Sequence, residues 1–136
     1  MRAILDTSIL LGGQFAIAST FEVAVASLSY AELQFGISKP GLSPQDFMAR
    51  QTRYQRLREQ FGDGLPFDDQ ASISYGLLAS LTLRAGRQLR GRQLDILIAA
   101  VAHANQAAIV TANPGDFIAL AGAIPVLDPL GDPWPN

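Results

Sequence analysis

The strongest constraint on the fold is the alternation of short apolar segments with helical segments along the whole chain. Each apolar segment is short enough to be one strand, and the residues between them show helical spacing and helix-capping residues. The five predicted strands are residues 2–6, 22–28, 65–67, 107–111 and 124–127. Strands that alternate with helices form parallel sheets, so the predicted class is α/β with a mainly parallel sheet.

Several of the predicted helices begin at capping residues or end near glycines. We expect Thr7 or Ser8 to cap the first helix, and Ser43 followed by Pro44 to open the helix after the second strand. The predicted helices cover roughly residues 8–20, 29–35, 44–61, 69–84, 94–106 and 114–121. The two helices between the second and third strands should form a helical protrusion. We expect one domain over residues 1–127 and a C-terminal extension over residues 128–136.

The composition excludes several classes of active site. The chain has 136 residues, no cysteine and a single histidine, His103. The absence of cysteine excludes thiol catalysis and zinc ribbons, and a single histidine argues against a His-rich metal site. Arg2 followed by apolar residues faintly resembles a signal peptide, but Asp6 interrupts the apolar run. We expect a cytoplasmic protein with no membrane association.

Four carboxylates occupy related positions at the ends of the predicted strands. Asp6 ends the first strand, and Glu32 lies one turn into the helix after the second. Asp95 starts the helix after an arginine-rich connection, and Asp116 follows the fourth strand. The carboxyl ends of parallel strands share one edge of a sheet, where ligands bind. The sequence therefore predicts that these acids converge at that edge.

Helix capping is the alternative role for each acid. Ser29 and Glu32 match a capping box, and Asp6, Asp95 and Asp116 could each stabilise the start of a helix. Four separate caps do not explain why all four acids fall at one edge. Two unit charges about 4 Å apart repel by about 4 kcal/mol at an effective dielectric of 20, so a cluster requires bound cations or protonation.

The ligand chemistry of such a cluster favours a hard divalent cation. Oxygen ligands without histidine or cysteine select Mg²⁺ or Mn²⁺. Four polar residues are placed to orient the carboxylates through hydrogen bonds: Thr7, Ser8, Thr111 and Asn113. The chain has no side-chain nucleophile with a paired base, and we interpret His103 as a helix-face residue. Attack of metal-activated water on a phosphodiester requires neither group.

The basic residues suggest where a phosphodiester substrate would bind. The net charge is −2, but eight of the ten basic residues form two groups. These groups are Arg50, Arg53, Arg56 and Arg58, and Arg84, Arg87, Arg90 and Arg92. They form either solvated helix faces or a basic rim around the acidic edge, with Arg90 and Arg92 as RNA-binding candidates.

Four sequence blocks, at residues 5–8, 29–37, 95–100 and 111–117, together resemble PIN-domain ribonucleases. More narrowly, the chain is similar to VapC-type toxins of bacterial type II toxin–antitoxin systems. The resemblance implies a three-layer α/β/α fold whose five-stranded parallel sheet has the order 3-2-1-4-5. It also implies a homodimer, Mg²⁺- or Mn²⁺-dependent cleavage of RNA, and a cognate antitoxin whose C-terminal segment covers the acidic site.

The resemblance extends to individual residues. By position, Asp6, Glu32, Asp95 and Asp116 match the family's catalytic, metal-binding acids. Thr111 and Asn113 match its supporting polar residues. The sequence departs from the family pattern at residues 114–115, where a Pro-Gly pair makes the loop before Asp116 turn-like and could displace that acid.

Two other functions fit parts of the sequence. A catalytically silent PIN-like module would bind RNA or a protein partner without cleaving, although it would not need to keep the acidic set. A phosphatase or receiver-like phosphoryl-transfer domain also uses acids at strand ends. It would require a second aspartate near Asp6 or a lysine after a late strand, and the only lysine, Lys39, lies elsewhere.

Overall fold

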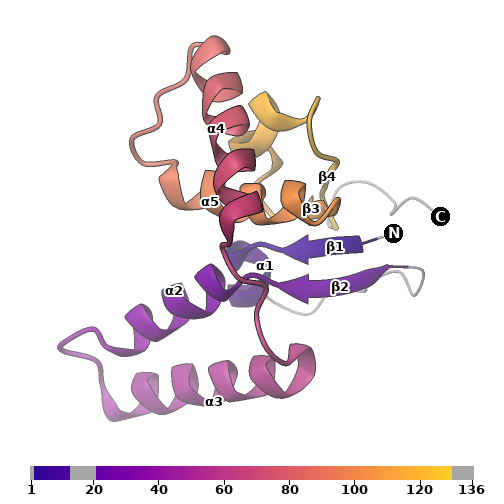
Figure 1. The fold of residues 1–136 in the computed structure, drawn as a ribbon. Coiled ribbons are helices and arrows are strands. Elements are labelled where there is room, and N and C mark those ends of the chain that lie inside the picture. Colours follow the sequence, from indigo (N-terminus) through magenta and orange to yellow (C-terminus); the bar gives the residue numbers. More distant parts are fainter. Residues whose placement is uncertain (1, 13–20, 130–136) are drawn as a thin grey trace.

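A four-stranded parallel sheet forms the centre of the fold (Figure 1). The computed structural model describes residues 2–12 and 21–129. Within them the strands are β1 (Arg2–Leu5), β2 (Glu22–Val25), β3 (Ala108–Val110) and β4 (Val126–Leu127). Their order is β2-β1-β3-β4, and all neighbouring pairs are parallel. The predicted α/β class with a parallel sheet is confirmed.

The predicted fifth strand, residues 65–67, is reduced to a single parallel bridge beside β2. Leu65 pairs with Ala26, and its backbone N–H donates to the Val25 carbonyl oxygen at 2.9 Å. Pro66 follows at once and has no N–H to continue the pairing. The prediction of five strands is therefore wrong for the described residues, which contain four. The bridge lies where the predicted order 3-2-1-4-5 places strand 3.

Helices cover both faces of the sheet. One face carries α1 (Thr7–Leu11), α2 (Ser27–Ile37) and α3 (Pro44–Phe61), which share a hydrophobic cluster with Ala3 and Leu5 of β1. The other carries α4 (Asp69–Arg84), α5 (Gln93–Ala104) and the 3₁₀ helix η1 (Pro114–Leu120), whose cluster includes Ile4. Successive β1 residues thus face opposite layers, as a strand buried on both sides requires. The three-layer arrangement is confirmed.

The helix starts follow the capping rules with two corrections. Ser43 accepts a hydrogen bond from the Asp46 N–H at 3.0 Å, and Asp68 accepts one from the Ala71 N–H at 3.0 Å. The first helix, however, is capped by Asp6 instead of Thr7 or Ser8, and it ends at Leu11. Residues 13–20 of the predicted helix lie outside the described residues. The second correction is that α2 begins two residues before the predicted start at Ser29.

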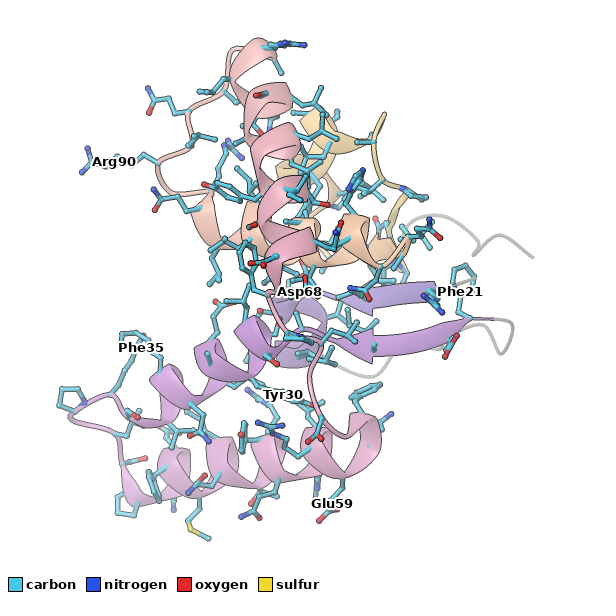
Figure 2. The ribbon with its side chains drawn as sticks, viewed as in Figure 1. Phe21, Tyr30, Phe35, Glu59, Asp68 and Arg90 are labelled. Carbon is cyan, nitrogen blue, oxygen red and sulfur yellow. The ribbon has the colours of Figure 1, made fainter. Side chains whose placement is uncertain are left out.

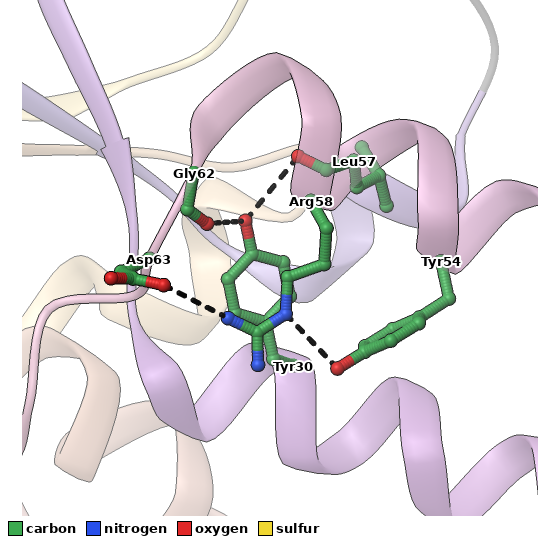
Figure 3. Close-up of polar contacts among 6 residues, drawn as sticks. All are labelled: Tyr30, Tyr54, Leu57, Arg58, Gly62 and Asp63. Atoms are coloured by element: carbon green, nitrogen blue, oxygen red, sulfur yellow. Dashed lines mark hydrogen bonds and ion pairs between the residues drawn. The ribbon is translucent and has the colours of Figure 1, made fainter.

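A polar and aromatic cluster around Tyr30 joins α2 to α3 (Figure 3). The Tyr30 hydroxyl donates to the Gly62 carbonyl oxygen at 2.8 Å, at the C-terminal end of α3. The Arg58 guanidinium lies 4.0 Å from the Tyr30 ring centroid, and its Nε donates to the Tyr54 hydroxyl at 3.0 Å. Arg58, a member of the first arginine group, therefore stabilises the contact between these helices.

The remaining sequence expectations concern the membrane and the tail. In the described ranges, 2–12 and 21–129, every helix is too short or too polar to cross a membrane. Of the expected C-terminal extension, only residues 128 and 129 fall within the described part. The domain boundary at residue 127 thus stays a prediction.

Candidate functional site

Asp6 lies at the point where β1 ends and α1 begins. Its backbone N–H donates to the Val110 carbonyl oxygen of β3 at 3.0 Å. Its carboxylate Oδ1 accepts the Ile9 N–H at 3.3 Å and also the Ser8 hydroxyl. Asp6 is only 4% exposed. The capping role is therefore real, but it occupies one carboxylate oxygen, and no bond from the described residues to Oδ2 is seen.

Glu32 is held by a hydroxyl of the neighbouring helix. The Thr7 hydroxyl of α1 donates to Glu32 Oε1, and Thr7 Oγ1 also lies 3.1 Å from the hydroxyl of Ser29. Ser29 is fully buried inside α2, whose N-cap is Ala26. The capping-box interpretation of Ser29 and Glu32 is therefore wrong. The serine belongs to a polar contact between α1 and α2.

Asp95 lies in the first turn of α5 and is surrounded by negative charge. Burial raises the pKa of its carboxyl group to about 6, and the charges of the other three acids act in the same direction. Arg92, the N-cap residue of α5, opposes this rise. The other acids, in decreasing order of effect, are Asp116, Asp6 and Glu32. The other three predicted acids thus lie within electrostatic range of Asp95.

Asp116 is the most exposed of the four acids. It lies in the first turn of η1, and its backbone N–H donates to the Asn113 carbonyl oxygen at 3.0 Å. Arg87 Nη1 donates to the Gly115 carbonyl oxygen at 3.0 Å, which ties the Pro-Gly turn to the arginine-rich connection. The turn does not separate Asp116 from the other acids, since its charge acts on Asp95 more strongly than theirs.

Hydroxyl groups connect the ends of β1 and β3. The Ser8 hydroxyl, which donates to Asp6, accepts the Ala112 N–H at 3.0 Å and lies 3.5 Å from the Thr111 hydroxyl. Thr111 is fully buried, and its Oγ1 accepts the Asn113 N–H at 2.9 Å. Thr7 and Ser8 therefore contact carboxylates directly, and Thr111 acts through Ser8. Asn113 enters this network through its backbone, and its side chain is exposed.

The acids form a cluster of like charges without converging on one point. Among residues 2–12 and 21–129, no three acidic, histidine or cysteine side chains are placed closely enough to hold a metal ion. The donors around Asp95 are all carboxylate oxygens, which suit Mg²⁺ or Mn²⁺. His103 contributes nothing there, because its Nδ1 is 2.8 Å from the Ser74 hydroxyl, about two helical turns from Asp95.

The two arginines proposed for RNA binding occupy different environments. Arg92 is half-buried at the start of α5, where its charge acts on Asp95. Arg90 is exposed and extends from the connection before α5 into open space (Figure 2). Arg92 therefore borders the acidic cluster, and Arg90 lies further out along the same connection.

Comparison with solved structures identifies close structural neighbours, whereas no protein-family model and no curated protein matches the chain. VapBC-5 from Mycobacterium tuberculosis, a member of the VapBC family of toxin–antitoxin systems, has a TM-score of 0.77 at 28% identity, over 93% of this chain and 96% of that chain. VapBC2 from Rickettsia felis, bound to a promoter DNA fragment, has a TM-score of 0.76 at 23% identity, over 94% and 98%. FitAcB from Neisseria gonorrhoeae has a TM-score of 0.76 at 22% identity, over 96% and 99%.

Proposed function

Since this chain shares its fold with VapBC structures and its sequence blocks resemble those of VapC-type PIN-domain toxins, we propose that it is a metal-dependent endoribonuclease toxin. The observation that carries the proposal is the meeting of four acids from distant segments at the carboxyl edge of the sheet. Each of the other three raises the pKa of Asp95. A fold gains no stability from gathering like charges, so their mutual proximity supports a cation-binding role.

The metal ligands in this proposal are the four acids, Asp6, Glu32, Asp95 and Asp116. When bound, Mg²⁺ or Mn²⁺ would act as a Lewis acid on the phosphodiester and lower the pKa of the attacking water. The chain's own contribution is to orient the carboxylates. Ser8 holds one oxygen of Asp6, and Thr7 holds Oε1 of Glu32, so both acids have restricted rotamers before any ligand arrives.

The proposed substrate is RNA, and the reaction is hydrolysis of its phosphodiester bonds. Arg92 borders the acidic cluster and Arg90 lies beyond it, which suits a basic rim that attracts the phosphate backbone. We assign both arginines to that rim.

The proposed partners follow from the structural neighbours, among which VapBC-5 is a member of a family of toxin–antitoxin systems. We propose a cognate antitoxin whose C-terminal segment covers the acidic edge, and a homodimer in the cytoplasm. The antitoxin would stop cleavage by occupying the site that the RNA needs.

One observation favours a second function, a catalytically silent PIN-like module that binds RNA or a partner. Within the described residues the acids are not grouped tightly enough to hold an ion without some rearrangement. A silent module would bind RNA equally well with and without divalent cations and would not cleave it.

Metal-dependent cleavage of structured RNA tests the proposal. The wild-type chain should cleave in Mn²⁺ and not in EDTA, and Asp6→Asn and Asp95→Asn should reduce cleavage to the EDTA level. Asparagine caps helices as well as aspartate does, so Asp6→Asn should still fold. Glu59→Gln is the matched control, because Glu59 is exposed on α3 and away from the cluster (Figure 2).

The same preparations separate the two functions. Wild-type RNA binding without cleavage in any divalent cation would overturn the nuclease assignment and favour the silent module. Reversing the charges of Arg90 and Arg92 should weaken RNA binding and reduce its salt dependence. An unchanged affinity would remove these two arginines from the proposed rim.

A further inference from the structure

A groove leads away from the acidic cluster along α2 and α3. It encloses about 600 Å³ and begins at Thr7 and Glu32, the pair joined by a hydrogen bond. Its outer part is lined by Phe35 in the last turn of α2, by Lys39 just after α2, and by Arg50 and Arg53 on α3. The groove therefore connects the proposed cleavage site with three basic side chains and an aromatic ring.

Two of the basic side chains are already committed to the walls of the groove. Arg50 Nη1 donates to the Gly36 carbonyl oxygen at 2.7 Å, which joins α3 to the last turn of α2. Lys39 Nζ lies over the Phe35 ring, 5.7 Å from its centroid. These contacts fix the wall that carries Phe35 while leaving both cations in the groove.

Arg53 and the face of the Phe35 ring that Lys39 does not cover are available to a ligand. In the described part of the chain, the Arg53 guanidinium makes no hydrogen bond or ion pair with protein. Phe35 is 70% exposed, and its side chain extends from α2 into open space (Figure 2). An exposed aromatic ring beside cations is the combination that binds single-stranded nucleic acid, through base stacking and phosphate contacts.

We propose that this groove binds a single-stranded segment of the RNA substrate, with a base stacked on Phe35 and a phosphate paired with Arg53. The inference rests on the proposed nuclease function and adds to it the path of the strand. The outer part of the groove has three cations against one acid, Asp46, so it attracts phosphates and repels a basic peptide. The strand then reaches the acids at the Glu32 end.

This path implies that the RNA near the cleavage point is unpaired. An exposed ring can stack only on a base that is free of its own helical stack. The specificity of the toxin would then include the presence of a single-stranded region, in addition to any base sequence.

Binding of a fluorescein-labelled oligouridylate to the full chain in EDTA tests the proposal without cleavage. Arg53→Gln should weaken binding and lower the magnitude of the salt slope, d log K/d log[salt], by about 0.7, the value for one phosphate contact in a single strand. Arg56→Gln is the matched control, since Arg56 is exposed on the same helix and does not line the groove. Equal losses in both variants would overturn a specific Arg53 contact.

Substitutions of Phe35 separate stacking from general apolar contact. Phe35→Leu should weaken binding about fivefold or more with an unchanged salt slope, whereas Phe35→Tyr should retain wild-type affinity. If Phe35→Leu binds as the wild type does, the groove does not stack a base on this ring, and the proposed path of the strand is wrong. Phe35 is exposed, so neither change should affect folding.

The outcomes distinguish this inference from the proposed function. Suppose that the wild-type chain cleaves RNA in Mn²⁺, and that Arg53→Gln and Phe35→Leu bind the oligouridylate with wild-type affinity. That result would overturn the RNA-binding role of the groove and leave the nuclease function intact. Weakened binding in both variants, with no cleavage under any condition, would overturn the nuclease function and leave the groove as an RNA-binding site.

Discussion

Asp95 is the residue whose acid–base chemistry is most altered by the fold. Burial and three neighbouring carboxylates raise its pKa from 3.8 to about 6. The folded state therefore binds this proton more tightly than the unfolded chain does. The stability that Asp95 contributes is fully present below pH 3.8 and is lost as the pH rises through about 6.

Replacing Asp95 by Asn should therefore stabilise the metal-free protein at neutral pH. The expected gain is about 1 kcal/mol, a value discounted because the side chain is partly exposed to solvent. The gain should disappear below the ordinary pKa of 3.8, where the wild-type carboxyl is also neutral. Urea unfolding in EDTA at the two pH values measures both effects. A gain that is independent of pH would contradict the charge explanation, and Glu59→Gln supplies the baseline.

Single residues show how far local sequence patterns can be trusted. The pattern at Asp6 predicted either a cap or a cluster acid, and the structure shows a cap whose charge also reaches Asp95. The pattern at Ser29 and Glu32 allowed a capping box as the alternative to a cluster acid, yet the helix starts at Ser27 and both side chains contact Thr7. A contact between α1 and α2 joins residues 22 or more positions apart, so local spacing could not predict it.

The contact between α2 and α3 depends strongly on one hydroxyl. Tyr30 is buried, and its hydroxyl donates to carbonyl oxygens of Gly62 and Leu57. Tyr30→Phe should lower the free energy of unfolding by about 1–2 kcal/mol, because the hydrogen bonds that this hydroxyl donates are lost. Tyr75→Phe is the control, since no hydrogen bond from the Tyr75 hydroxyl is seen in the described residues. Equal urea midpoints for Tyr30→Phe and the wild type would contradict this role.

At the level of elements, periodicity predicted the type of each segment better than its length. The predicted third strand, residues 65–67, is reduced to one bridge because Pro66 ends the pairing. The backbone just before it, at Gly64, approaches α2 too closely for any side chain. A Cβ at Gly64 would lie 2.6 Å from the Ser27 backbone nitrogen. Pro66 is visible in the sequence. The requirement for glycine at position 64 could not be predicted, because it depends on Ser27, a neighbour 37 positions away.

Metal binding should be visible as a change in the stability of the whole molecule. A ligand that binds the folded state alone stabilises it, by about 2.7 kcal/mol at a concentration one hundred times its Kd. Mn²⁺ at millimolar concentration should therefore raise the Tm, and Asp95→Asn should reduce the increase. Thermal melting with and without Mn²⁺ measures it. The absence of any increase in the wild type would count against a metal site.

For the whole molecule, the order of elements was enough to predict the sheet and the edge at which the acids meet. Every strand is parallel to its neighbours, so residues after β1, β2 and β3 had to share one edge. The groove beside that edge was not predicted, because Phe35 and Arg53 lie on two helices whose packing has no local signal. The packing of these two helices is set by tertiary contacts such as the hydrogen bond from Arg50 to Gly36.

The pair α2–α3 projects from the rest of the fold (Figure 1), and α3 contains no buried residue. Regions with little buried surface open locally at a lower free energy than the core. Amide hydrogens of α3 should thus exchange with solvent faster than those of α5, which is buried along much of its length. Because α2 supplies Glu32 and packs against α3, an opening that extended from α3 into α2 would detach one acid from the cluster while the sheet remained folded.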